Sequence, residues 1–203
     1  MSTATETTAG AAGLRGVVAA QSAIGDVNGE QGILIYQGYD IHDLAEHSTF
    51  EEVVFLLWNG RLPKAEELDA LKADLREHYE APAEVIALMK QFPKDAEPMD
   101  VLRTSVSALD FFDKAGHGTD RENATKAAIK LTGQIGTLAA AWDRIRQGKE
   151  VVAPDHTLSI AENFLYMLRG VKPDADEARM FDIALILHAD HELNASTFTT
   201  RVV

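Results

Sequence analysis

The chain is 203 residues long, with 46% hydrophobic residues, no cysteine and a formal net charge of −13 at pH 7. This composition allows a folded core, excludes disulfides and a cysteine nucleophile, and suits a reducing compartment such as the cytoplasm. We expect no nucleic-acid binding, because Lys and Arg are not clustered, and no membrane span, because no apolar run reaches about 18–20 residues.

The first residues, MSTATETTAGAAG, contain no basic residue and no long apolar run, so neither a secretory signal nor a transit peptide is expected. We expect residues 1–15 to form a flexible tail and residues 16–203 to form one large helical domain. At the start of this domain, DVNGEQG separates two apolar runs within residues 16–38. Apolar runs on either side of a Gly- and Asn-containing turn are typical of a small β-hairpin.

Helical signals dominate the rest of the chain. Ser48 and Glu51 have the spacing of a capping box, which predicts the start of a helix. Gly60 and Pro63 predict its end. Residues 64–81 have the apolar spacing and interleaved charges of an amphipathic surface helix. Further helices are expected at residues 83–92, 99–112, 122–145, 158–168 and 177–188.

Two of the predicted helices contain stretches that are apolar on all faces, at residues 129–142 and 178–188. A helix without a polar face belongs in the interior, so both are predicted to be central helices. Gly133 and Gly136 each cost about 1 kcal/mol of helix propensity relative to Ala. That cost is tolerable if another backbone approaches closely at these positions. The sequence therefore predicts an all-α fold with a small N-terminal β element.

The second apolar helix is followed by four polar residues, His188, Asp190, His191 and Glu192. Burying a polar group without a partner costs roughly 2–7 kcal/mol, so four such groups at the end of an apolar helix indicate a cleft. If the helix continued, His188 would share one face with His191 and Glu192. A single histidine at this place is most simply a structural core residue, but the cluster favours a ligand-binding site.

Metal binding is a second interpretation of the cluster, because His188, Asp190 and His191 are all of metal-ligand types. This interpretation suits a metal-dependent phosphohydrolase built on a helical bundle. The segment lacks the histidine pair of an H-E-x-x-H motif and no further ligand set is evident, so we predict no metal site. The loop histidines His117 and His156 are expected to be exposed.

Arg103 is the other candidate for function. Pro98 and the apolar residues after it at helical spacing predict the helix that carries this arginine. One interpretation of Arg103 is a solvated or paired surface residue. The other is a guanidinium that binds a carboxylate, for which its planar fork is suited.

Three segments in this order resemble one known family. They are GLRGVVAAQSAIGDVNGEQGILIYQGYDIHDLAEHSTFEEVVFLLWNGRLP at residues 13–63, PMDVLRTSVSALDFFD at residues 98–113 and HADHELNASTFTTRVV at residues 188–203. Together they resemble the N-terminal, large-domain portion of citrate synthase. The resemblance is strongest to the shorter bacterial and archaeal citrate synthases and to 2-methylcitrate synthases, and it covers the whole chain after the first dozen residues.

This resemblance implies an all-α homodimer with a large and a small domain, which condenses oxaloacetate with acetyl-CoA and water to citrate and CoA without a cofactor. His191, the second histidine of the His-x-Asp-His-Glu motif, would contact oxaloacetate, and His188 and Asp190 would support it. The place of Arg103 in the PMDVLRT motif implies a further substrate contact. An imidazole can hydrogen-bond a carboxylate, and it adds positive charge when protonated.

The same resemblance places the catalytic residues of the family, two histidines and an aspartate, beyond Val203, together with further substrate-binding arginines. We therefore expect no catalytic residue in this chain, an end before the small domain, and the C-terminal remainder of the enzyme as a partner. Asn194 or Ser196 is expected to cap a last helix. The rival interpretations are a 2-methylcitrate synthase that uses propionyl-CoA, the metal-dependent phosphohydrolase, and a non-catalytic helical module.

Overall fold

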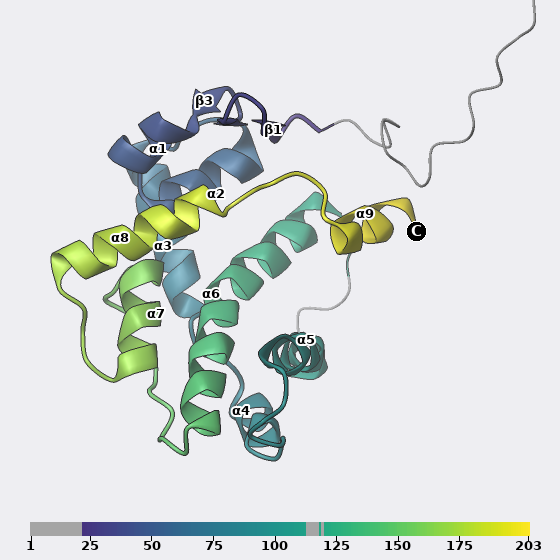
Figure 1. Ribbon diagram of the computed structural model, residues 1–203, viewed down its shortest axis with the longest axis vertical. Coiled ribbons are helices and arrows are strands. Elements are labelled where there is room, and N and C mark those ends of the chain that lie inside the picture. The colour runs from purple at the N-terminus through teal and green to yellow at the C-terminus, as the bar shows by residue number, and fades with distance from the viewer. Residues whose placement is uncertain (1–21, 113–117, 119) are drawn as a thin grey trace, which may run out of the picture.

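The computed structural model describes residues 22–112, 118 and 120–203; the tail expected at residues 1–15 and His117 lie outside them. Figure 1 shows a long helix, α6, in the middle of the fold, with the strands and α1 at one end and α9 near the C-terminus. The predicted fold, helical with a small N-terminal sheet, is confirmed. Its elements are β1 (Gly25–Asn28), β2 (Ile33–Tyr36), β3 (Tyr39–Asp40), α1 (Ile41–His47), α2 (Phe50–Asn59), α3 (Ala65–Glu77), α4 (Ala83–Met89), α5 (Pro98–Leu109), the 3-10 helix η1 (Asp110–Phe112), α6 (Arg121–Arg146), α7 (Ile160–Arg169), α8 (Ala175–Leu187) and α9 (Ala195–Val202).

The three strands form one antiparallel sheet in the order β1-β2-β3. Tyr36 of β2 pairs with Gly25 of β1 on one side and with Tyr39 of β3 on the other. The predicted hairpin is the β1-β2 pair. After β2 the chain reverses through Gln37 and Gly38, with φ angles of 50° and 88°. The side chain of Tyr36, in the middle strand, is fully buried.

Helix α6 is a central helix, as its apolar sequence predicts, because α3, α4, α5 and α7 all pack against it. Neighbours on several sides explain why the middle of α6 lacks the charged stripe of a surface helix. None of the helices in the described part of the chain is long and apolar enough to cross a bilayer. The largest core cluster of the described residues is formed by α4, α5 and α6. Its buried residues are Val85, Met89, Val101, Ala108, Leu109, Leu138, Ala141, Trp142 and Ile145.

Gly133 lies where α6 meets the C-terminal end of α3. A Cβ at this position would come within 2.7 Å of the His78 carbonyl oxygen and 3.1 Å of the Leu75 carbonyl oxygen. At Gly136 a Cβ would meet only the Phe164 ring, at an ordinary 3.7 Å. The predicted close approach of another backbone is therefore confirmed for Gly133 and wrong for Gly136.

Helix α8 is not a central helix, although its sequence is apolar on all faces. It packs against α1, α2 and α7, and Asp182 and Ile186 are its only buried residues. Met180 and Leu187 remain 66% and 38% exposed. The prediction of a second central helix is wrong for the described residues, because the elements that pack on α8 leave much of its apolar surface uncovered.

The capping box of α2 lies one residue later than predicted. Thr49 is the N-cap: its side chain accepts the N–H of Glu52, and the Glu52 carboxylate accepts the N–H of Thr49. Ser48 is instead the C-cap of α1, and the carboxylate of Glu51 accepts the N–H of Ile160, the first residue of α7. Both candidate pairs have the same spacing, so only the tertiary contact of Glu51 distinguishes them.

Candidate functional site

The polar cluster predicted to form a site is the turn between α8 and α9. His188 is the C-cap of α8, and Asn194 caps α9, as predicted. The rings of His188 and His191 lie nearly parallel, with their centroids 6.1 Å apart. Both side chains are exposed, as is Glu192. The structure thus brings the two predicted histidines side by side, at the surface and not in a buried cleft, because the end of α8 is itself uncovered.

Each of these histidines bonds one ring nitrogen to the last turn of α8. Nδ1 of His188 lies 2.7 Å from the Ala184 carbonyl oxygen, and Nε2 of His191 lies 2.9 Å from the Leu187 carbonyl oxygen. A carbonyl oxygen only accepts, so each of these nitrogens carries a proton. The other nitrogen of each ring is an acceptor in the neutral state and a donor once protonated. Both rings can therefore hydrogen-bond a hydroxyl or a carboxylate.

Asp190 is tied to the N-terminal sheet. The Tyr36 hydroxyl donates to the Asp190 carbonyl oxygen at 3.0 Å and accepts the Asp190 N–H at 3.1 Å. The Asp190 carboxylate accepts the N–H of Glu192, whose φ is 67°. Burial raises the pKa of the Tyr36 hydroxyl, and its hydrogen bond with Asp190 opposes that shift. Sequence reasoning missed Tyr36, whose only signal was its place at the end of an apolar strand.

Arg103 lies on α5, away from the histidine turn. Its guanidinium is exposed and forms an ion pair with Asp100 at 3.0 Å. Helix α5 packs against α4 and α6, and Figure 1 shows it well separated from the end of α8. The described chain therefore does not bring Arg103 and His191 together, and the geometry of Arg103 fits a paired surface residue. Its role in binding a carboxylate stays a prediction.

A metal site has no support in the geometry of the turn. Among residues 22–112, 118 and 120–203, no three His, Asp or Glu side chains lie together in a way that could hold a metal ion. His188 and His191 each turn one nitrogen back to a helix carbonyl, and the Asp190 carboxylate faces the Glu192 N–H. The described residues thus give the phosphohydrolase interpretation no ligand set.

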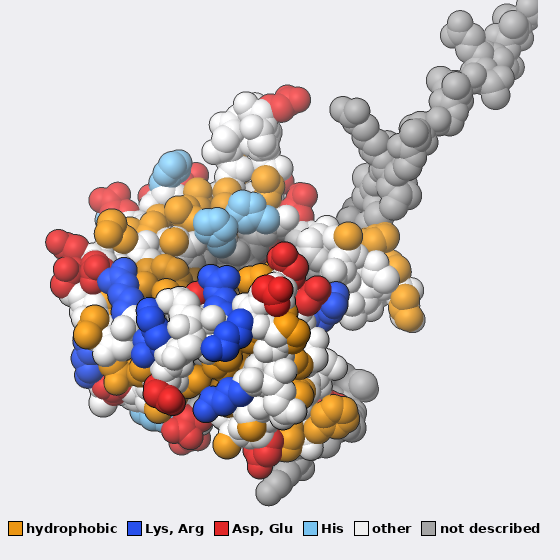
Figure 2. All heavy atoms as spheres, turned by 60° about the horizontal axis from the view of Figure 1, so that its bottom comes forward, with side chains coloured by type: hydrophobic (Ala, Val, Ile, Leu, Met, Phe, Trp, Pro, Cys, Tyr) orange, Lys and Arg blue, Asp and Glu red, His pale blue; other side chains and the backbone are white. Residues whose placement is uncertain are grey.

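Charge is unevenly distributed over the surface. The chain has a formal net charge of −13, yet Figure 2 shows Lys and Arg side chains gathered on one part of a face, with Asp and Glu side chains around them, so the expectation that Lys and Arg are not clustered is wrong for this face. Because the net charge is strongly negative and acidic side chains surround this group, the overall field would not attract an anion. An anionic substrate would therefore need local donors, such as the two histidine rings.

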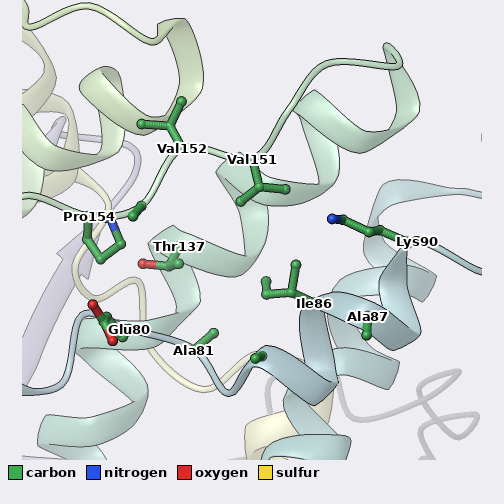
Figure 3. Close-up of a pocket in the computed structure, with 11 residues that line it drawn as sticks. Glu80, Ala81, Ile86, Ala87, Lys90, Thr137, Val151, Val152 and Pro154 are labelled. Carbon is green, nitrogen blue, oxygen red and sulfur yellow. The ribbon is translucent and has the colours of Figure 1, made fainter.

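A concave region lined by other residues than those of the histidine turn was not predicted from the sequence. This cavity of about 420 Å³ lies between α4, α6 and the segment after α6 (Figure 3). Its wall is mostly aliphatic, and its lining residues are Glu80, Ala81, Ala83, Ile86, Ala87, Lys90, Thr137, Val151, Val152, Ala153 and Pro154.

Two of the polar groups that line this cavity are bonded within the protein, and Lys90, at its edge, is exposed. Thr137 is its one buried polar side chain, and its hydroxyl donates to the Tyr79 carbonyl oxygen at 2.6 Å. Glu80 is exposed, and its Oε1 lies 3.5 Å from Nε2 of His156. Nδ1 of the same histidine bonds the Arg76 carbonyl oxygen. His156 is exposed, as predicted. We therefore place the candidate site at the histidine turn and not in this cavity.

Comparison with known proteins gives one consistent result. A family model described as "Citrate synthase, C-terminal domain" matches residues 13–203. The chain is 44% identical to the citrate synthase of Haloferax volcanii over 194 residues, which is 94% of this chain and 51% of that protein. It is 41% identical to 2-methylcitrate synthase 2 of Corynebacterium glutamicum, with the same coverage of both chains. The crystal structure of citrate synthase from Pyrobaculum aerophilum superposes with a TM-score of 0.86, at 37% identity, over 94% of this chain and 50% of that one.

The family model extends over nearly the whole chain, and its match includes the histidine turn and the segment with Arg103. The chain spans about half the length of the curated relatives it matches. The family model is that of a C-terminal domain, whereas the order of the motifs predicts the N-terminal half; the assignment to the N-terminal half stays a prediction. The chain belongs to the citrate synthase family.

Proposed function

We propose that this chain is part of a citrate synthase, which joins the methyl carbon of acetyl-CoA to the carbonyl carbon of oxaloacetate and yields citrate and CoA after water cleaves the thioester. The observation that carries this proposal is the family match over residues 13–203. The fold agreement with a solved citrate synthase at a TM-score of 0.86 supports it. The reaction needs no cofactor, because the thioester activates the methyl proton and the oxaloacetate carbonyl is the electrophile.

Within this proposal, His191 contacts oxaloacetate, and His188 and Asp190 support it. In each exposed ring at the end of α8, one nitrogen bonds a helix carbonyl oxygen, and the other donates to a carboxylate or carbonyl oxygen when the ring is protonated. Arg103 is proposed as a further contact. Because the described chain places Arg103 away from His191, this contact is proposed only for the complete enzyme, where a substrate carboxylate would replace the exposed Asp100 as the partner of Arg103.

We further propose that the chain supplies the N-terminal half of the enzyme and acts with a C-terminal remainder, as a homodimer in the cytoplasm. The coverage of about half of each relative supports a second half of similar length. The exposed apolar side chains of Met180 and Leu187 on α8 and of Val202 on α9 offer surface for a partner polypeptide to cover. The proton-transfer residues would lie in that second half.

The test uses the protein encoded by the gene of this chain, including any coding sequence after Val203. Thiol release from acetyl-CoA is followed with and without oxaloacetate, and the product is identified. We expect thiol release that depends on oxaloacetate, and citrate as the product. No thiol release with any short acyl-CoA would contradict the proposal and favour a non-catalytic helical module, and metal-dependent phosphate release would favour the phosphohydrolase.

The second candidate is a 2-methylcitrate synthase, which would use propionyl-CoA. It is favoured by the 41% identity to the Corynebacterium glutamicum protein and by the 37% identity to a Bacillus subtilis protein named citrate/2-methylcitrate synthase. The same assay with propionyl-CoA distinguishes the two. A higher kcat/KM for acetyl-CoA supports citrate synthase, and a higher value for propionyl-CoA supports the second candidate.

A further inference from the structure

We propose that Tyr36 is a positioning residue for His191, so that the N-terminal sheet sets the geometry of the oxaloacetate contact. The inference rests on the proposed role of His191. Tyr36 and the residue it holds, Asp190, are separated by 154 positions in the sequence. Only the tertiary fold therefore brings these two residues together.

The Tyr36 hydroxyl holds both polar backbone atoms of Asp190. It has one proton, and the Asp190 carbonyl oxygen at 3.0 Å is a nearer acceptor than the Leu187 carbonyl oxygen at 3.5 Å. As an acceptor, the same oxygen takes the Asp190 N–H at 3.1 Å. A residue held through both its N–H and its C=O has little freedom to rotate. The backbone from which the next residue, His191, extends is thus fixed.

Tyr36 can act as an anchor because it is itself immobilised in the core. Its side chain is fully buried, and its strand is paired on both sides. The tyrosine ring belongs to a core cluster that joins β2, α1, α2 and α8, formed by Tyr36, Ile41, Leu44, Val53, Leu56 and Ile186. Because the ring is fixed in the core, the hydroxyl that bonds Asp190 is fixed as well.

Strand β1 restrains the same turn by lying against the side chain of Asp190. A Cβ at Gly25 would come within 2.8 Å of Asp190 Oδ2 and 3.2 Å of the Ile35 carbonyl oxygen. The strand backbone therefore lies directly against the Asp190 carboxylate, which in turn accepts the N–H of Glu192. Asp190 is held by β2 through its backbone and flanked by β1 at its side chain. This arrangement explains how an exposed turn can present a histidine in one orientation.

The substitution Tyr36→Phe keeps the buried ring and removes both hydrogen bonds. In the complete enzyme we expect the oxaloacetate KM to rise roughly threefold to tenfold, kcat to fall less than in His191→Ala, and the acetyl-CoA KM to stay near its original value, because the His191 contact is displaced and not removed. Tyr39→Phe is the matched control. Tyr39 lies in the same sheet, is 39% exposed, and its hydroxyl makes no hydrogen bond with the described residues.

A second readout uses the 203-residue chain and needs no activity. Amide hydrogen exchange and the ring resonances of His191 are compared in the parent chain and in the two tyrosine variants. In Tyr36→Phe we expect the Asp190 amide to exchange about tenfold faster or more, and the His191 ring resonances to shift. The melting temperature should fall by only several degrees relative to Tyr39→Phe, because two hydrogen bonds are lost and the core ring is retained. Loss of structure alone would change exchange throughout the chain.

Comparison with His191→Ala separates failure of this inference from failure of the proposed function. If His191→Ala raises the oxaloacetate KM and Tyr36→Phe changes neither the KM nor Asp190 exchange, Tyr36 does not position the histidine. If His191→Ala leaves the KM unchanged, the proposed role of His191 is wrong, whatever Tyr36 does to the turn. A raised KM in both variants, with Tyr39→Phe unchanged, supports the inference.

Discussion

Glu51 of α2 caps α7 through a tertiary contact: its carboxylate accepts the N–H of Ile160 at 2.9 Å. A negative charge at a helix N-terminus is favourable, but the glutamate is almost fully buried. Burial raises the pKa of Glu51, the Ile160 hydrogen bond opposes that rise, and the neighbouring Asp182 adds to it. The unfavourable effect of burial on the charged form therefore dominates.

This balance predicts how stability depends on pH. Because the folded-state pKa of Glu51 is above its ordinary value of 4.5, the folded chain binds this proton more tightly than the unfolded chain. Ionisation of Glu51 therefore lowers the free energy of unfolding as the pH rises from its ordinary pKa through the raised one.

In Glu51→Gln this loss should be absent. The free energy of unfolding of the parent minus that of Glu51→Gln should be larger at pH values below the ordinary pKa of Glu51 than at neutral pH. Urea unfolding at a series of pH values measures it. A difference that stays constant over the series would show that the carboxyl does not titrate with a raised pKa.

Gly133→Ala should destabilise the fold by about 1–3 kcal/mol, because the new Cβ would press on the carbonyl of His78, which is backbone and cannot move as a side chain can. Gly136→Ala is the control in the same helix. Its Cβ would meet only a ring edge, and it should stabilise the helix by up to about 1 kcal/mol. Denaturant unfolding of both variants tests this, and equal effects would contradict the close approach at Gly133.

His191→Ala in the complete enzyme should weaken oxaloacetate binding and slow turnover, since hydrogen bonds to charged groups contribute about 1.5–3 kcal/mol. His188→Ala should have a smaller effect. Steady-state kinetics for both substrates measures the two variants. A larger effect at His188 would mean that the two histidines have exchanged roles.

Arg103→Lys keeps the charge and loses the planar fork. If Arg103 binds a substrate carboxylate, the oxaloacetate KM should rise while kcat changes little. Asp100→Asn is the control, because it removes only the present ion-pair partner of Arg103. An unchanged KM in Arg103→Lys would leave Arg103 as a paired surface residue.

Local sequence patterns predict where a helix or strand lies better than they predict which other segments pack against it. The apolar runs around DVNGEQG predict the hairpin, and Asn194 is the N-cap of α9, because such turn and cap signals act over a few residues. The capping-box pattern fits Ser48 with Glu51 as well as it fits Thr49 with Glu52, which is the pair that forms. The pattern cannot tell which glutamate turns toward α7.

The remaining errors concern contacts between distant segments. An apolar sequence predicts that α8 can be buried, but whether it is covered depends on which elements reach it, and Met180 stays exposed. The bond between Tyr36 and Asp190 spans 154 positions, so no periodicity or spacing predicts it. Residue types alone predict a site at the histidine turn, whereas only the folded structure shows that Tyr36 holds this turn.

The measurement that tests the central claim most directly is thiol release by residues 1–203 alone and after mixing with a separately produced C-terminal half of the enzyme. The reaction needs a base for the methyl proton and donors for the developing oxyanion, each typically contributing about 100-fold or more. We propose that this chain contributes a substrate contact and not those groups. We predict no oxaloacetate-dependent thiol release from the chain alone and measurable release from the mixture. Release by the chain alone at the rate of an ordinary enzyme would contradict the account.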